Sequence, residues 1–179
     1  GFLSVVIAVG VSMLCGLLIG LCHVYLKIPS FMASFAFMYI CKGIGMVSYQ
    51  GHPPTIKDPV ITALPTTTFL GIPFITWVAI VMFLLCFFIQ EYTAFGRHIY
   101  AVGTNENIPR SVGVSVEKVK IGVFTLAGFL FGVAGVIGAI RLGQGQIAIG
   151  DDKMFPAQAA VVVGGTSLAG GKGGVVESF

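Results

Sequence analysis

Charged side chains are scarce in this sequence. They make up 9% of its 179 residues, while apolar residues make up 56%. A soluble domain carries about 25% charged residues, and one of this length leaves roughly 30% of its unfolded surface exposed to water. So few charges could not keep that surface in solution. The composition therefore excludes a water-soluble globular domain and indicates lipid as the main solvent of the chain.

Patterns typical of metal, redox and nucleic-acid sites are also missing. The four cysteines lie inside apolar runs with no Cys-x-x-Cys pair, a placement typical of buried thiols; they are Cys15, Cys22, Cys41 and Cys86. The three histidines fall in separate segments. The ten Lys and Arg residues give a net charge of only +3 and form no basic stripe. We therefore expect no metal, no cofactor and no nucleic-acid partner.

Four long apolar stretches are present instead. Their bounds are Phe2–Cys22, Phe31–Val47, Phe69–Ile89 and Ile121–Ile140, and Lys42 is the only charged residue among them. A bilayer core of about 30 Å requires about 20 apolar residues of helix, and lipid offers backbone N–H and C=O groups no partner outside the helix. The sequence thus predicts an all-α fold, a polytopic transmembrane helix bundle with about four full spans.

Glycine spacing in two of these stretches indicates close helix packing. Gly16 and Gly20 form one Gly-x-x-x-Gly pair, Gly128 and Gly132 form another, and Gly135 and Gly138 continue the second strip. Small residues let two backbones approach where lipid supplies no hydrophobic drive. For the first pair, the general glycine content of membrane helices is an equally good explanation.

Positive charge predicts the orientation of the chain. Arg97, Arg110, Lys118 and Lys120 lie between the third and fourth stretches, whereas residues 48–68 hold only Lys57. Lys and Arg mark cytoplasmic loops, so residues 90–120 and the short link 23–30 are expected in the cytoplasm and 48–68 outside. Residues 141–155 must then lie outside, although Arg141 and Lys153 weaken the contrast there.

The stretch "VVVGGTSLAGGKGG" at 161–174 resembles a phosphate-binding loop, but the spacing fails. Such a loop needs Gly, four residues, then Gly-Lys and Ser or Thr, whereas Thr166 stands five positions before Gly171 and Gly173 follows Lys172. The preceding apolar run, Pro156–Val163, is too short to span. We expect a broken or re-entrant helix near a transport path, with Gly164, Gly165, Thr166 and Ser167 beside it; a plain glycine-rich connection is the alternative.

The segment "FGRHIYAVGTNENIPRSVGVSVEKVK" at 95–120 is long for a connection between two helices. Asn105 or Asn107 could cap a short helix that contains Pro109 in its first turn and runs through Val112, with Gly113 ending it. A second helix start follows at Ser115, with Glu117 in its first turn. A short helix on the cytoplasmic face suits docking to another protein.

These stretches together resemble the ribose/xylose/galactose-type permease subunits of ATP-binding-cassette (ABC) importers. The similarity rests on "FGRHIYAVGTNE", "VGVSVEKVKIGVFTLAGFLFGVAGVIGAIRLG", "AAVVVGGTSLAGGKGG" and "KIPSFMASFAFMYICKGIGMV". Two positions depart from the family pattern: Ile108-Pro109 replaces a usual pair of alanines, and Lys42 replaces a usual arginine.

The resemblance implies a function and a set of partners. It implies that residues 1–179 are a fragment of one permease domain in the bacterial cytoplasmic (inner) membrane, which is not an enzyme and moves a monosaccharide such as ribose or xylose. The expected partners are a separate ATPase subunit, an extracytoplasmic sugar-binding protein, a second permease subunit and membrane lipid. It assigns ATPase coupling to residues 91–120, through Phe95, Gly96, Arg97, Gly103, Asn105 and Gly113. Arg97 and Arg110 are candidate partners of ATPase acids, with positive-inside topology as the equal alternative.

Few polar side chains lie inside the predicted spans. Ser34, Tyr39, Thr76 and Thr125 are candidates for the translocation path, although most Ser and Thr in membrane helices bond only their own backbone or a neighbour. Two other functions stay open: an ion-coupled secondary transporter, against which the spans contain no Asp or Glu, and a membrane-embedded enzyme, against which they contain no cluster of ionisable groups.

Overall fold

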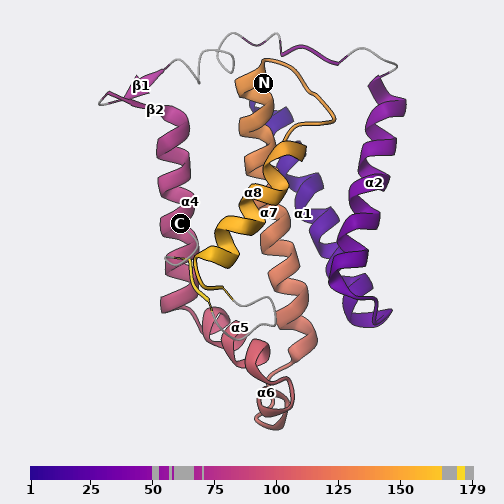
Figure 1. The fold of residues 1–179 in the computed structure, drawn as a ribbon, viewed down its shortest axis with the longest axis vertical. Helices are drawn as coiled ribbons and strands as arrows, with labels where there is room; N and C mark the ends of the chain where they lie inside the picture. Colours follow the sequence, from indigo (N-terminus) through magenta and orange to yellow (C-terminus); the bar gives the residue numbers. More distant parts are fainter. Residues whose placement is uncertain (50–52, 57, 59–66, 70, 167–172, 176–179) are drawn as a thin grey trace. The chain divides into compact units, whose positions relative to one another are not determined.

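The computed structural model describes residues 1–49, 53–56, 58, 67–69, 71–166 and 173–175 of the chain (Figure 1). The described helices are α1 (Phe2–Tyr25), α2 (Ser30–Tyr49), α4 (Phe74–Tyr92), α5 (Ala94–Thr104), α6 (Asn107–Ser111), α7 (Val116–Leu142) and α8 (Asp151–Val163). Two short antiparallel strands, β1 (Thr68–Phe69) and β2 (Ile72–Pro73), precede α4. The predicted all-α membrane bundle is confirmed: α1, α2, α4 and α7 are long and apolar enough to cross a bilayer.

The third predicted span, Phe69–Ile89, begins before the helix that the structure shows, α4. Phe69 lies in the β1–β2 hairpin, which turns at Gly71 with a φ of 78°, and the helix starts at Phe74. The positive φ of Gly71, together with the missing N–H of Pro73 and the clash of its ring with a preceding helical turn, stops the helix from extending back to residue 69. The helix that contains the fourth predicted span, α7, starts at Val116 with Glu117 in its first turn, which agrees with the predicted helix start at Ser115.

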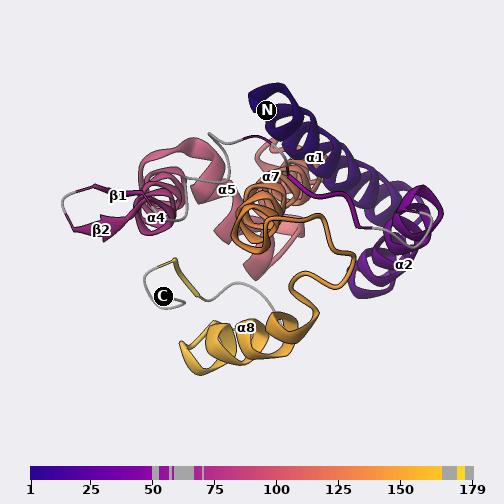
Figure 2. The same cartoon turned by 90° about the horizontal axis from the view of Figure 1, so that it is seen from above.

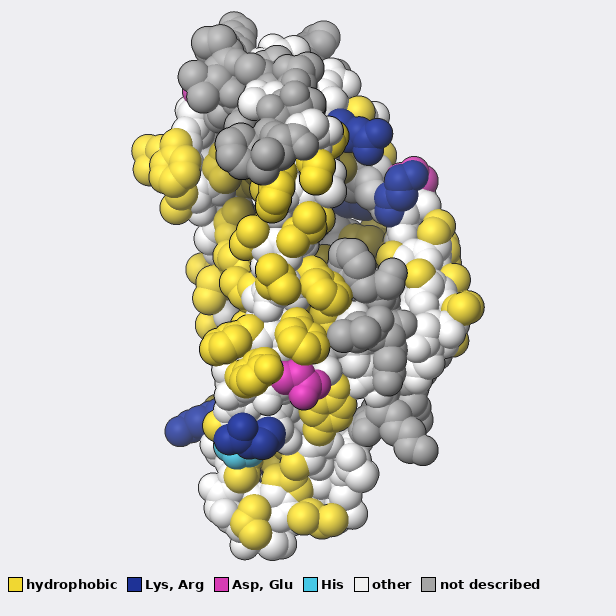
Figure 3. Space-filling model, turned by 90° about the vertical axis from the view of Figure 1, so that its left-hand side faces the viewer, with side chains coloured by type: hydrophobic (Ala, Val, Ile, Leu, Met, Phe, Trp, Pro, Cys, Tyr) yellow, Lys and Arg dark blue, Asp and Glu magenta, His cyan; other side chains and the backbone are white. Residues whose placement is uncertain are grey.

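Apolar side chains on α4 remain exposed. Val81, Leu84 and Phe88 are 54%, 55% and 59% exposed, and Figure 3 shows apolar side chains covering the middle of the face that it presents. Water would not tolerate so continuous an apolar surface on a stable helix, whereas hydrocarbon does. The exposure therefore fits a helix that faces lipid.

By its contacts the chain divides into two compact units, Gly1–Trp77 with Ile121–Gly150 and Val78–Lys120 with Asp151–Phe179. The first unit is held by a glycine seam, which we define as Gly16 and Gly20 of α1 with Gly128 and Gly132 of α7. A Cβ at Gly16 would overlap the carbonyl oxygen of Phe124 and lie 2.9 Å from Gly128 Cα. The two helices lie side by side along this seam (Figure 2).

A polar contact reinforces the glycine seam. Ser12 Oγ donates a hydrogen bond to the carbonyl oxygen of Gly128 over 2.8 Å. The seam ends sooner than the sequence predicts, because a Cβ at Gly135 would meet nothing within 4 Å and one at Gly138 would meet Ile149. Both predicted Gly-x-x-x-Gly pairs thus mediate packing, while Gly135 does not.

The first unit also joins two connections that the charge pattern places on one side of the membrane. The N–H of Ile56 donates to the carbonyl of Gly143, and the N–H of Gly145 donates to that of Pro54, both over 2.9 Å. These bonds form an isolated bridge between Thr55 and Gln144. Segments 48–68 and 141–155 are therefore linked, which agrees with their predicted location on the same, outer side.

The short helix α8 has 13 residues, about 20 Å at about 1.5 Å per residue, less than the about 30 Å of a bilayer core. Two acids in its first turn, Asp151 and Asp152, favour its start. A hydrogen bond from Lys153 holds the pKa of Asp152 below its usual range. The prediction of a short helix before the glycines is confirmed, although the helix begins at Asp151 and includes Pro156.

Candidate functional site

The coupling segment, residues 91–120, begins with a sharp junction between α4 and α5. Thr93 has an extended backbone, and its Oγ1 accepts a hydrogen bond from the N–H of Gly96 over 3.2 Å, an N-cap for α5. Gly96 is buried; a Cβ there would overlap the carbonyl oxygen of Gln90 and lie 2.5 Å from that of Ile89. Only glycine lets the two helices meet so closely at this junction.

Helix α5 itself was not predicted from the sequence. The signal was available, because Thr93 precedes the helix as a cap and Phe95, Ile99 and Val102 recur at helical spacing. This apolar stripe packs on the start of α7. The cluster that results has a buried core of Val102, Val116 and Val119, exposed by 8%, 1% and 7%, surrounded by Phe95, Ile99 and Val114.

The helix α6 is short, and the predicted start and end of it are largely correct. Glu106 is its N-cap residue without a side-chain bond, but Asn105 Oδ1 accepts a hydrogen bond from the N–H of Asn107 over 2.9 Å. At the other end Gly113 has a φ of 83°. Its N–H bonds the carbonyl of Arg110, and the N–H of Val114 bonds that of Pro109, the two bonds of a Schellman motif.

Two ion pairs tie α6 to the first turns of α7. The guanidinium of Arg110 contacts the carboxylate of Glu117, and Lys120 Nζ lies 2.7 Å from Glu106 Oε1. Each exposed pair contributes little by itself, because water screens the charges. The two pairs add to the valine cluster and the Schellman motif, so that α5, α6 and the start of α7 can move as one body.

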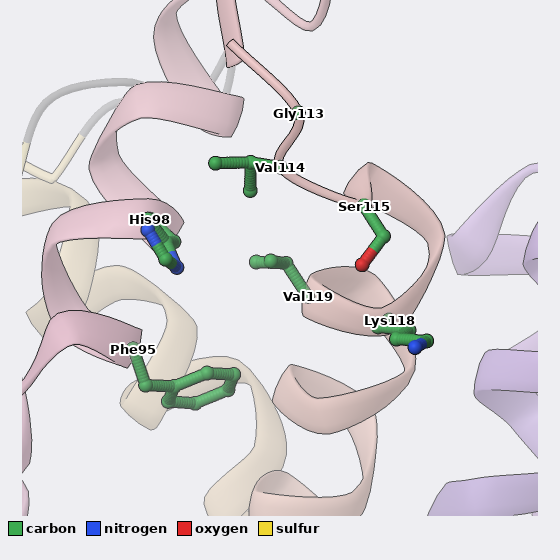
Figure 4. A pocket seen from close by; sticks show the side chains of 7 residues that line it. All are labelled: Phe95, His98, Gly113, Val114, Ser115, Lys118 and Val119. Atoms are coloured by element: carbon green, nitrogen blue, oxygen red, sulfur yellow. The ribbon is translucent and has the colours of Figure 1, made fainter. Parts of the chain in front are cut away.

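A hollow of about 340 Å³ lies between α5 and the start of α7. It is lined by Phe95, His98, Gly113, Val114, Ser115, Lys118 and Val119. Phe95 and His98 come from α5 and face Val114 and Val119 across the hollow (Figure 4). The surface around it is apolar with a basic edge.

The seven predicted coupling residues fall into two groups. Phe95, Gly96 and Gly113 shape the segment, through the apolar cluster, the helix junction and the turn after α6 respectively. The other four are exposed, as is Gly113; they are Arg97, Gly103, Asn105 and Arg110. Sequence reasoning did not single out Ile108 and Val112, which are 64% and 75% exposed and give α6 an apolar surface.

The predicted translocation residues do not form one described site. Ser34 Oγ donates to the carbonyl of Ser30 and Thr125 Oγ1 to that of Ile121, each within its own helix. Tyr39 is 65% exposed, and Thr76 is exposed in the first turn of α4. Within the described residues none of these four hydroxyl groups bonds another helix, whereas Ser12 does.

The predicted residues after α8 have a clear local structure. Gly165 has a φ of 99° and its N–H bonds the carbonyl of Val162, while the N–H of Thr166 bonds that of Val161. Helix α8 therefore also ends in a Schellman motif, for which Gly165 is the required glycine. Gly164 is the residue before it, and Ser167 lies outside the described residues. Across the described part of the chain, no group of three or more His, Cys, Asp or Glu residues could hold a metal ion.

Comparison with known proteins adds the following. Residues 1–175 match the family described as "Branched-chain amino acid transport system / permease component". The chain is 38% identical over 157 residues to the ribose import permease protein RbsC of Haemophilus influenzae, covering 86% of the chain and 49% of the relative. It is 38% identical over 147 residues to the probable ABC transporter permease protein YphD of Escherichia coli, covering 82% and 44%.

A third relative is the xylose transport system permease protein XylH of Haemophilus influenzae, 44% identical over 105 residues, which cover 59% of the chain and 28% of the relative. No solved structure matches the chain. The chain thus spans at most 49% of the length of these three relatives.

Proposed function

Since this chain belongs to the permease-component family of branched-chain amino acid transport systems, we propose that it is part of the membrane path of an ATP-driven sugar importer. The observation that carries the proposal is the extent of the match, residues 1–175, which includes all four long apolar helices together with the coupling segment. Ribose and xylose are the substrates named for two relatives, so a monosaccharide is the proposed cargo.

We assign three partners to the full-length protein. A separate ATPase subunit hydrolyses ATP and binds the coupling segment, a sugar-binding protein delivers cargo to the opposite face, and a second permease subunit completes the path. The exposed apolar residues Ile108 and Val112, with exposed Arg110 between them in the sequence, support docking of a protein at α6. The chain itself performs no covalent step.

The construction of the coupling segment supports this role. A docked ATPase changes shape with its nucleotide state. The coupling segment transmits that change only if it does not deform. The valine cluster, the two ion pairs and the turn at Gly113 supply that stiffness within the unit. The ATPase shifts the permease between outward and inward access to the extent that its contacts differ between the two states.

The test uses the full-length permease, its ATPase subunit and its sugar-binding protein in proteoliposomes. We expect uptake of labelled ribose or xylose to require ATP, and to stop when the catalytic glutamate of the ATPase is replaced. Uptake driven by a sodium or proton gradient without ATP would instead establish a secondary transporter. A screen of monosaccharides against the binding protein identifies the cargo.

A further inference from the structure

Residues 173–175 are bound by side chains of α4 and α5. Gln90 Oε1 accepts a hydrogen bond from the N–H of Val175 over 2.7 Å. Tyr100 Oη donates one to the carbonyl oxygen of Gly173 over 2.6 Å. These bonds join positions 85 and 73 residues apart in the sequence, and all four residues belong to the same compact unit.

The two side chains stand on opposite arms of the α4–α5 junction. Gln90 is near the end of α4 and Tyr100 is in α5, and the junction at Thr93 and Gly96 turns the chain between them. The amide of Gln90 is oriented by a second bond, because its Nε2 donates to Glu91 Oε1 over 3.1 Å. The Oε1 atom of Gln90 therefore faces the N–H of Val175.

Glycine is required where these side chains meet the backbone. Gly173 has a φ of 134°, and a Cβ there would lie 2.6 Å from Thr166 Cγ2. A Cβ at Gly174 would lie 3.2 Å from Gln90 Nε2 and 3.7 Å from Tyr100 Oη. Because glycine has no side chain, Gly173 can lie against Thr166 and Gly174 can lie against the Gln90 amide.

The contact of Gly173 with Thr166 connects this stretch to α8. Thr166 belongs to the Schellman motif that ends α8, and no residue of α8 is buried. The contact at Thr166 is therefore a direct restraint on the C-terminal end of α8 from residues 173–175.

We propose that Gln90 and Tyr100 form a polar clamp that carries the motion of the coupling segment to the C-terminal end of α8. The clamp joins two features that the proposed function leaves unconnected, the segment that docks the ATPase and the broken helix at the transport path. Gln90 and Tyr100 are positioning residues in this scheme, because they act on α8 through backbone groups of Gly173 and Val175. The inference rests on the proposed function.

The test separates sugar transport from ATP hydrolysis in the full-length complex. Tyr100→Phe removes one hydroxyl group, and Gln90→Leu removes both polar atoms of the amide at similar size. We expect each variant to retain the ATPase subunit in co-purification and to lower the sugar imported per ATP hydrolysed by about fivefold, the factor that corresponds to one net hydrogen bond. A role in stability alone would lower the melting temperature of the complex and leave that ratio unchanged.

Two matched controls accompany these variants. Tyr25→Phe removes the same hydroxyl group from a ring that is 72% exposed in α1, outside the coupling segment, and should leave the transport ratio unchanged. The exchange of Gln90→Glu with Glu91→Gln keeps an acceptor for the Val175 N–H and a donor beside it, and should preserve the ratio that Gln90→Leu loses.

The outcomes separate the two hypotheses. Wild-type transport per ATP in both Tyr100→Phe and Gln90→Leu overturns the clamp, and so does an equal loss in Tyr25→Phe. A wild-type complex that imports sugar without ATP overturns the proposed function instead. If Gln90→Leu does not assemble, Tyr100→Phe decides the question, since it removes a single oxygen atom.

Discussion

Gly113 and Gly96 are both candidate coupling residues, but they need glycine for different reasons. Gly113 has a positive φ, and a Cβ there would meet nothing within 4 Å, whereas Gly96 has helical geometry and backbone oxygens where its Cβ would be. The cost of a methyl group is conformational at the first position and steric at the second. Substitutions at the two glycines should therefore respond differently to the choice of replacement.

At Gly113, the replacement Gly113→Ala should weaken ATPase docking and sugar uptake, because a left-handed conformation costs an alanine about 1–2 kcal/mol. Gly113→Asn should retain most of the activity, since Asn tolerates this conformation better. Binding of the purified ATPase subunit to the reconstituted permease, measured by titration, checks both. Equal affinity for the glycine, asparagine and alanine forms would contradict the role of the turn.

At Gly96, the replacement Gly96→Ala should destabilise the full-length permease by about 1–3 kcal/mol, the usual cost of overpacking. The oxygens of Gln90 and Ile89 belong to backbone and cannot rotate away. The melting temperature of the detergent-solubilised protein is the measurement. Gly103→Ala is the matched control on the same helix, where an exposed position should gain slightly in helix stability; a loss of ATPase docking by that control alone would assign Gly103 to the docking surface.

At the scale of elements, α1 and α7 depend on close backbone approach. Gly16→Ala should separate the two helices, because its Cβ would overlap the carbonyl oxygen of Phe124. Gly10→Ala on the same helix has nothing within 4 Å of its Cβ and should be neutral or slightly stabilising. Thermal unfolding of the two variants distinguishes them, and a melting temperature of Gly16→Ala equal to that of Gly10→Ala would show that the seam contributes nothing.

Helix existence was easier to predict than helix ends. Lipid requires long apolar helices, so four spans follow from composition and length alone. The start of α4 was misplaced because Phe69 and Leu70 continue the apolar run, while Gly71 and Pro73, which end it, were given too little weight. Helix α5 was missed although its cap and its apolar spacing are visible in the sequence. The local pattern does not reveal that the apolar stripe of α5 packs against α7.

The site was predictable only in part, for a related reason. Gly113 and Asn105 were found because turns and caps depend on neighbours in sequence. The bonds of Gln90 and Tyr100 to residues 173–175 connect distant segments, and no local pattern marks either side chain as a contact. Sequence patterns indicate what each segment does, but not which segments meet.

For the chain as a whole, orientation decides the functional assignment. The coupling segment carries four of the ten Lys and Arg residues of the chain, and two of these, Arg110 and Lys120, have acidic partners nearby. The positive-inside rule counts Lys and Arg and gives little weight to Asp and Glu. The prediction that 91–120 is cytoplasmic therefore survives the ion pairs.

This orientation can be measured on the full-length protein with its four apolar-segment cysteines replaced by alanine. Ile108→Cys places a thiol on exposed α6, and Gln146→Cys places one on the segment that is bridged to Thr55. A membrane-impermeant maleimide should label position 146 in spheroplasts and position 108 only in inverted vesicles. Each variant is the other's control for reagent access, since both positions are exposed in the same protein. Labelling of position 108 in intact spheroplasts would place α6 outside the cell, where no ATP is available, and an ATPase could then not act on it.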